Sequence, residues 1–159
     1  MAGGKGDDTY RVDNAADAVT EWSDEGHDTV VAQVSYVLPE WVEDLRLEGS
    51  ADLYGIGNML DNTLYGNAGN NVLDGAAGTD TMVGGEGDDQ YYVDETADRV
   101  IESADQGHDI VRSTASYVLA DNVEDLQLEN GADIDGTGNA LDNVIVGNTG
   151  ANRLEGRDG

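Results

Sequence analysis

The stretch from Gly75 to Tyr92 reads GAAGTDTMVGGEGDDQYY and holds two consecutive nine-residue words of the form G-G-x-G-x-D-x-U-x, where U is a large apolar residue. Glycines at positions one, two and four allow backbone angles that a β-carbon would forbid, so the chain can turn tightly with its carbonyl groups directed inward. Asp80 and Asp89 stand at position six, and the apolar residue two positions later begins a short strand. Carboxylate and carbonyl oxygens around one hollow are the ligands that Ca²⁺ prefers. The stretch therefore predicts turns that bind calcium.

The composition also points to bound cations. The 159-residue chain has a formal net charge of −27 and no cysteine. A chain this acidic resists compaction unless cations neutralise part of its charge, so we expect folding to depend on metal. Seven Lys and Arg residues stand against 34 Asp and Glu, which argues against nucleic acid as a partner. No apolar run is long enough for membrane insertion, and neither a disulfide nor a thiolate metal site can form.

An 81-residue unit occurs almost twice. The segment Gly3–Tyr10 (GGKGDDTY) returns as Gly84–Tyr91 (GGEGDDQY), and no gap is needed between the two copies. Internal repetition of this kind indicates a solenoid. We therefore predict an all-β chain with a first unit at residues 1–83 and a truncated second unit at residues 84–159, stacked in one continuous solenoid. We also expect the chain to be part of a longer protein.

The nine-residue period predicts which carboxylates meet. If one word makes one turn and one short strand, two words complete a coil, and position-six residues 18 apart lie about 4.8 Å from one another in the stacking direction. A cation between two turns then takes oxygens from both carboxylates and from backbone carbonyls. The strongest predicted pairs are Asp80 with Asp98, which are 18 apart, and, after a two-residue slip in the pattern, Asp89 with Asp109 and Asp8 with Asp28; Asp17 is a weaker candidate. The expected carbonyl ligands belong to Gly3, Lys5, Gly6, Gly75, Ala77, Gly78, Gly84, Glu86 and Gly87.

Two words, Gly57–Tyr65 and Gly66–Asp74, carry Asn62 and Asn71 at position six instead of Asp. Asparagine tolerates left-handed turns and can hydrogen-bond to its copy one coil away. An uncharged amide is a poorer calcium ligand than a carboxylate. Two interpretations therefore stay open, a structural asparagine ladder, which we prefer, and a weak calcium site at Asn62 and Asn71.

The remaining acidic and histidine residues do not predict catalysis. His27 and His108 occupy equivalent turn positions, and a catalytic residue rarely recurs in every repeat. No nucleophile with a neighbouring base stands out, so we do not expect an enzyme. The solvated face of the strands is expected to carry Glu43, Asp44, Glu124 and Asp125.

The words Gly3–Arg11, Gly75–Val83 and Gly84–Tyr92 resemble the RTX (repeats-in-toxin) family. The whole chain is similar to large-unit variants found in secreted bacterial adhesins, hydrolases and mannuronan epimerase modules. The resemblance implies a right-handed parallel β-roll or β-helix solenoid with several Ca²⁺ ions between stacked Gly/Asp-rich turns. It further implies type I secretion, with folding outside the cell or at the bacterial surface. We expect a monomer whose partners are Ca²⁺ and the other domains of its parent protein.

Two functions follow from these observations. The first is a calcium-dependent folding module that serves as a spacer, a stabiliser and a secretion-coupled folding switch. The alternative is a polysaccharide- or surface-binding module. It is suggested by four aromatic residues that have no aromatic counterpart in the second unit, Trp22, Trp41, Tyr54 and Tyr65.

Overall fold

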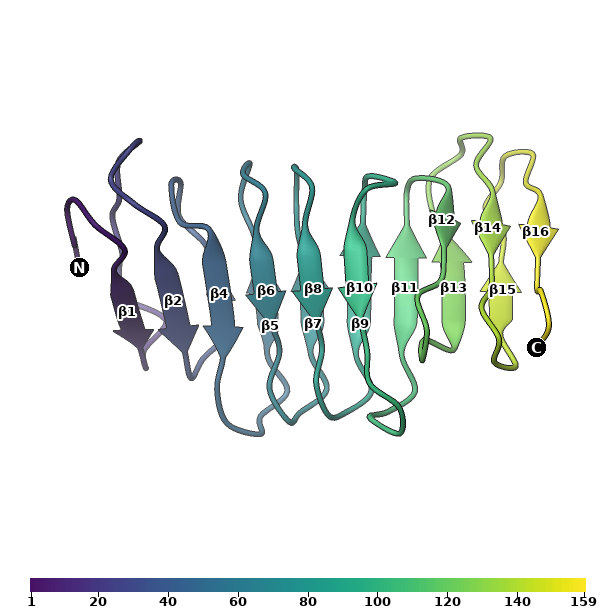
Figure 1. The fold of residues 1–159 in the computed structure, drawn as a ribbon, viewed down its shortest axis with the longest axis horizontal. Helices are drawn as coiled ribbons and strands as arrows, with labels where there is room; N and C mark the ends of the chain where they lie inside the picture. The colour runs from purple at the N-terminus through teal and green to yellow at the C-terminus, as the bar shows by residue number, and fades with distance from the viewer.

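The structure, a computed structural model, describes all 159 residues and consists of short strands and turns (Figure 1). The strands are β1 (Thr9–Val12), β2 (Thr29–Ala32), β3 (Tyr36–Val37), β4 (Asp44–Leu47), β5 (Tyr54–Ile56), β6 (Thr63–Tyr65), β7 (Val72–Asp74), β8 (Thr81–Val83), β9 (Gln90–Val93), β10 (Arg99–Ile101), β11 (Ile110–Ser113), β12 (Tyr117–Val118), β13 (Asp125–Leu128), β14 (Gly136–Thr137), β15 (Val144–Val146) and β16 (Leu154–Glu155). The prediction of an all-β chain is confirmed. No part of the structure is a helix with the length and apolar character needed to span a membrane.

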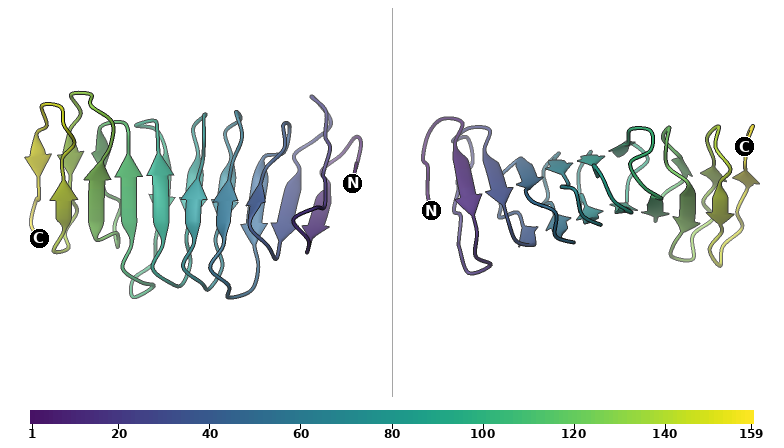
Figure 2. Two further views of the ribbon diagram at one scale, coloured as in Figure 1. Left: turned by 180° about the vertical axis from the view of Figure 1, so that it is seen from behind. Right: turned by 90° about the horizontal axis from the view of Figure 1, so that it is seen from below.

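All strand pairs are parallel, and the pairing partner of each strand lies one coil away along the chain. The strands form a six-stranded sheet (β1-β2-β4-β6-β8-β10), a seven-stranded sheet (β3-β5-β7-β9-β11-β13-β15) and a three-stranded sheet (β12-β14-β16). The strands stand side by side along the long axis of the molecule, with the termini at opposite ends (Figure 1). Views from behind and from below show the chain winding between the two layers (Figure 2). The molecule is therefore a parallel β-solenoid, as the sequence predicts.

The length of each coil explains how the two repeat units are related. Regular coils have an 18-residue period, as in the register Thr63↔Thr81. The coil from Thr9 to Thr29 is longer, with a spacing of 20, and the next, from Thr29 to Asp44, is shorter, with a spacing of 15. Four coils carry the chain from β1 to β8, so the 81-residue shift between the units adds a further half coil. Strand β1 consequently lies in the six-stranded sheet and its counterpart β9 in the seven-stranded sheet, and equivalent residues of the two units face opposite sides of the solenoid.

The core is a pair of apolar ladders between the sheets. The six-stranded sheet contributes, in register, Tyr10, Val30, Leu45, Leu64, Met82 and Val100, and the facing sheet contributes Leu73, Tyr91, Val111, Leu126 and Ile145. All except Ile145 are buried. Each ladder residue packs on the coils before and after it, so the fold gains its stability mainly between neighbouring coils.

Truncation of a ladder residue tests this description. Leu73 is fully buried, so Leu73→Ala is expected to lower the free energy of unfolding by about 2–5 kcal/mol through lost burial and the cavity left behind. Val37 is 52% exposed on β3, and Val37→Ala serves as the control with an expected change of about 0.5 kcal/mol or less. Urea unfolding of both variants in saturating CaCl₂ measures the difference. Equal midpoints would contradict the assignment of Leu73 to the core.

Candidate metal sites in the turns

The turns bring together all three of the carboxylate pairs that the nine-residue word predicts. In each pair, the carboxylate of the later coil accepts the backbone N–H of its counterpart in the earlier coil. Asp98 Oδ1 lies 3.0 Å from the nitrogen of Asp80. The same bond measures 2.8 Å from Asp89 to Asp109 and from Asp8 to Asp28. The stacking of position-six residues along each edge of the solenoid is therefore present in the structure.

The first carboxylate of each pair keeps one oxygen without a hydrogen bond. These oxygens are the buried Oδ2 atoms of Asp8, Asp80 and Asp89. Asp80 and Asp89 as whole residues are only 1% exposed. A buried carboxylate oxygen without a partner is costly, and a bound cation is one of the few groups that can compensate it. The three pairs thus have the chemistry of cation sites.

The backbone carbonyls named from the sequence are also free. Among the hydrogen bonds of the chain, none is accepted by the carbonyl oxygen of Gly3, Lys5, Gly6, Gly75, Ala77, Gly78, Gly84, Glu86 or Gly87. Some of these oxygens face the adjacent coil closely. A β-carbon at Gly57 would overlap the oxygen of Gly75, and one at Gly66 would overlap the oxygen of Gly84. Glycine at position one therefore makes room for carbonyl oxygens between coils.

In the Asn-bearing coils, the asparagine side chain itself hydrogen-bonds to backbone groups of its own turn and of the preceding coil. Asn62 Nδ2 donates to the carbonyl oxygens of Val42 and Glu43, both at 3.1 Å, and Asn62 Oδ1 accepts the N–H of Asn58 at 2.7 Å. Asn143, its counterpart in the second unit, makes the equivalent bonds. We expected a ladder in which the asparagine side chains bond to one another, but they bond mainly to backbone carbonyl groups of the preceding coil. A weak calcium site at Asn62 or Asn71 stays a prediction.

Comparison with known proteins agrees with this geometry. Residues 56–91 and 137–159 match the family model of the RTX calcium-binding nonapeptide repeat (4 copies). These two segments therefore carry RTX calcium-binding repeats. The chain is also 39% identical over 66 residues to the endo-1,3-1,4-beta-glycanase ExsH of Rhizobium meliloti (strain 1021), which covers 42% of this chain and 14% of that protein. The chain thus matches only a small part of its relative's length. No solved structure matches it.

Asp17 is the one carboxylate of the predicted RTX set that lies apart from the others. Its Oδ2 accepts the N–H of Asn14 at 3.3 Å, within its own turn. It belongs to neither of the groups in which three acidic side chains converge. Its counterpart Asp98, by contrast, receives the N–H of Asp80 from the preceding coil. Asp17 lies too close to the N-terminus to have such a preceding coil.

Two glutamates that we expected on a solvated strand face instead extend the rows of stacked position-six carboxylates at the edges of the solenoid. Glu43 Oε2 accepts the N–H of Asp28 at 2.8 Å, and Glu124 Oε2 accepts that of Asp109 at 2.8 Å. The coils between these residues are shortened to a spacing of 15, and a longer side chain spans the changed distance. The expectation was therefore wrong for these two residues. Asp44 and Asp125 are half-buried and pair with the exposed His27 and His108 at 3.1 and 3.2 Å.

Two further acidic residues, Glu21 and Glu102, were missed. Glu21 converges with Asp8 and Asp28, and Glu102 converges with Asp89 and Asp109, with ligand atoms in each group within 4.8 Å of one another. The two glutamates are related by the 81-residue shift and begin words that lack glycine at positions one, two and four. The sequence does contain a signal for them: each glutamate lies two nine-residue words after a position-one glycine, Gly3 or Gly84, and so stands at position one itself.

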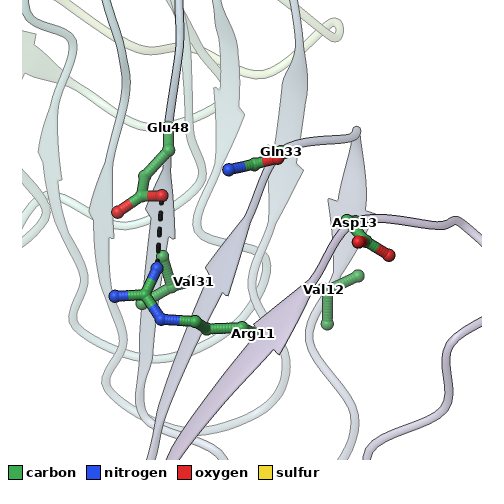
Figure 3. A pocket seen from close by; sticks show the side chains of 6 residues that line it. All are labelled: Arg11, Val12, Asp13, Val31, Gln33 and Glu48. Carbon is green, nitrogen blue, oxygen red and sulfur yellow. Dashed lines mark hydrogen bonds and ion pairs between the residues drawn. The ribbon is translucent and has the colours of Figure 1, made fainter.

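A separate surface pocket beside β1, β2 and β4 has a different character (Figure 3). Arg11 Nη1 lies 3.4 Å from Glu48 Oε2, and the Arg11 side chain is 73% exposed. An exposed ion pair of this kind contributes about 0–1 kcal/mol to stability. The pocket holds no buried carboxylate oxygen without a partner and is not part of the candidate sites; its lining residues are Arg11, Val12, Asp13, Val31, Gln33 and Glu48.

Burial makes three of the position-six carboxylates hard to ionise when no cation is present. It raises the pKa of both Asp80 and Asp89 to about 7 and the pKa of Asp109 to about 6. Hydrogen bonds from backbone N–H groups lower these pKa values in part, and neighbouring carboxylates raise them again. Deprotonation of the stacked turns therefore opposes folding of the metal-free chain.

A pH titration in chelator tests this electrostatic cost. An acid whose pKa is higher in the folded than in the unfolded chain binds its proton more tightly when folded. The metal-free fold is therefore most stable below the unfolded pKa of about 4, and it loses that stability as the pH rises through about 7. Far-UV circular dichroism in chelator should show more β structure at pH 5 than at pH 8. A calcium-saturated sample is the control, and loss of β structure on acidification to pH 5 would refute the expectation.

Proposed function

We propose that this chain is an RTX module that binds Ca²⁺ between its stacked turns and completes its folding when it does so outside the cell. In this role it acts as a spacer, a stabiliser and a folding switch for a larger secreted protein. One observation carries the proposal: three stacked Asp pairs each keep a buried carboxylate oxygen without a hydrogen bond, next to turns whose carbonyl oxygens are also free.

The donor set favours calcium over other metals. The proposed ligands are carboxylate oxygens of Asp8, Asp28, Asp80, Asp98, Asp89 and Asp109, together with the carbonyl oxygens of the same turns. Calcium accepts six to eight oxygens in flexible geometry, whereas Mg²⁺ demands a tighter octahedron and zinc prefers His and Cys. The Asn-bearing coils form the metal-free part of the module in this proposal.

Coupling between folding and binding follows from charge. The chain carries a net charge of −27, and coils stack carboxylates directly above one another. Each site that exists only in the folded chain adds about 2.7 kcal/mol of stability when Ca²⁺ is at 100 times its dissociation constant. Three such sites suffice to convert a chain that is marginal without calcium into a stable solenoid. Low calcium inside the cell would then keep the chain unfolded for export.

The place of the module in a larger protein is part of the same proposal. The aligned relative is named as a glycanase, and the match covers 14% of its length, which supports a repeat segment attached to a separate catalytic region. The recurrence of the carboxylate sites with the repeat supports a structural role for them. We therefore propose that the module is secreted with its parent and has no catalytic activity of its own.

A calcium titration of the metal-stripped chain tests the proposal. Far-UV circular dichroism should show a cooperative gain of β structure with CaCl₂ and little gain with MgCl₂. Asp80→Asn keeps an oxygen that can accept the N–H of Asn62 but removes the charge, so it should remove one bound ion and raise the calcium midpoint. Equilibrium dialysis counts the ions.

The matched control is Asp88→Asn. Asp88 is exposed at position five, next to Asp89, and its Oδ1 accepts the N–H of His108 at 3.0 Å, which an amide oxygen also can do. This variant carries the same charge change but should keep the ion count. A β spectrum that is complete in chelator would refute the folding switch. A wild-type chain that binds no calcium would refute the sites as well.

A second candidate function, polysaccharide binding, is favoured by a stripe of exposed apolar side chains. Trp22, Trp41 and Met59 lie on successive turns at one edge of the solenoid, with exposed fractions of 67%, 40% and 84%. One surface pocket lies between Trp22 and Trp41, and another between Trp41 and Met59. Tyr54 and Tyr65 lie on β5 and β6 of opposite sheets, so they do not belong to this stripe.

The backbone at Trp41 is the specific observation in favour of this stripe. Trp41 has a φ angle of 67°, in the left-handed region that costs a bulky residue about 1–2 kcal/mol. Its counterpart Asn122 has a φ of 66°, and asparagine tolerates this conformation well. Asn122 also donates to the carbonyl oxygen of Glu102 at 3.0 Å, a bond that tryptophan cannot replace. A large aromatic side chain is thus held at a strained, exposed turn, as is typical of binding surfaces.

The substitution Trp41→Asn separates this function from folding. We propose that the stripe stacks on a β-1,3-1,4-linked glycan, the class of polymer named for the aligned glycanase. Trp41→Asn should reduce retention in an affinity gel containing that glycan at least tenfold, while raising the free energy of unfolding by about 1 kcal/mol. Tyr54→Ala, on the seven-stranded sheet, is the control and should bind like the wild type. Unchanged retention of the Trp41→Asn variant would rule out the stripe as the binding surface.

A further inference from the structure

Glu21 and Glu102 occupy a place in the coil that glycine occupies elsewhere. Words with a complete turn begin with glycine at position one, as at Gly3 and Gly84. Glu21 and Glu102 follow these glycines by two words, so they stand at position one of the next coil on the same edge. They are 4% and 8% exposed, which is unusual for an acidic residue without a cationic partner. The third pair, Asp80 with Asp98, has the apolar Val93 at the corresponding place.

The two glutamates point into the gap between the coils. Glu21 Oε1 accepts the N–H of Gly3 at 3.2 Å, and Glu102 accepts the hydroxyl of Tyr91. The other oxygen of each, Oε2, is buried and has no hydrogen bond. Each glutamate therefore offers one oxygen that is fixed by the protein and one that is free, and the free oxygen lies next to the carboxylates of an Asp pair.

A buried tyrosine hydroxyl points independently to a ligand at the first cluster. Tyr10 is 6% exposed, and its hydroxyl has no hydrogen-bond partner. A β-carbon at Gly3 would overlap both this hydroxyl and Asp8 Oδ2, so the two groups converge on the same space beside the glycine. In the second unit a β-carbon at Gly84 would overlap the Tyr91 hydroxyl and Asp89 Oδ2. The same arrangement is thus built twice, at opposite edges of the solenoid.

We propose that Glu21 and Glu102 are additional cation ligands that turn two of the Asp pairs into three-carboxylate sites, distinct from the two-carboxylate site at Asp80 and Asp98. This proposal rests on the proposed calcium-binding function. Cation affinity rises with the number of charged ligands, so the two three-carboxylate sites bind calcium-sized cations more tightly than the third site. Three negative charges also match a trivalent cation, so these sites prefer Tb³⁺ to Ca²⁺.

Terbium luminescence tests the assignment. Tyr91 contacts Glu102 and can transfer excitation energy to an ion bound there. When Tb³⁺ is titrated into the calcium-loaded wild type, we expect it to occupy the two tight sites at a lower concentration than the third. Glu102→Gln retains an oxygen for the Tyr91 hydroxyl but loses the charge. It should weaken Tb³⁺ binding at one site by tenfold or more. Glu21→Gln should do the same for the other tight site.

Charge-matched controls make the result specific. Glu155→Gln removes one negative charge at an exposed position near the C-terminus and should leave both tight sites unchanged. If Glu21→Gln and Glu102→Gln bind Tb³⁺ with the wild-type affinity and number of ions, the third-ligand assignment is overturned while calcium binding by the Asp pairs stands. If the wild-type chain takes up neither Ca²⁺ nor Tb³⁺, both the assignment and the proposed function fail.

Discussion

The stacking of carboxylates at the spacing of a β-sheet is the constraint on which the rest of this structure depends. Parallel strands hold successive coils about 4.8 Å apart, and position six of each coil faces position six of the next. When both are Asp, the later carboxylate accepts the backbone N–H of the earlier residue, and the earlier carboxylate keeps one buried oxygen without a partner. The apolar ladders hold the coils together, while the turns at their edges push them apart. Calcium is the ion that suits this oxygen-rich gap, and the match of two segments to the RTX calcium-binding repeat agrees with that chemistry.

The half-coil offset between the two units decides where these sites lie. Because the 81-residue unit makes four coils and a half, the cluster around Asp8 and the cluster around Asp89 fall on opposite edges of the solenoid. The pair formed by Asp80 and Asp98 shares the edge of the first cluster. Like charges are thereby distributed over two edges instead of one. A feature that occurs in only one of the two units, such as Trp41, therefore has no copy on the opposite edge.

Much of the fold and part of the site could be predicted from the sequence because the 18-residue coil is a strict period where the words are complete. That period identified the pair of Asp80 with Asp98, and a two-residue slip in the pattern added the pair of Asp89 with Asp109, without any knowledge of the structure. It failed where the coil length changes. Because a lengthened coil is followed by a shortened one, Glu43 stacks on Asp28 in the row of position-six carboxylates and not on the expected solvated face. Glu21 was missed because its word lacks glycine at positions one, two and four.

Asparagine and aspartate coils solve the same problem in opposite ways. The two side chains differ by one group: asparagine offers N–H donors where aspartate has a second acceptor oxygen. Asn62 can therefore satisfy the carbonyls of Val42 and Glu43, whereas Asp80 adds an unpaired oxygen to the gap. In the proposed function, coils of the second kind bind an ion and coils of the first kind are held by their own hydrogen bonds. Since each coil packs mainly on its neighbours, the Asn coils provide a calcium-independent surface on which the following Asp coils can stack. We infer that the Asn coils determine where folding begins and that the Asp coils determine the calcium concentration at which it is completed.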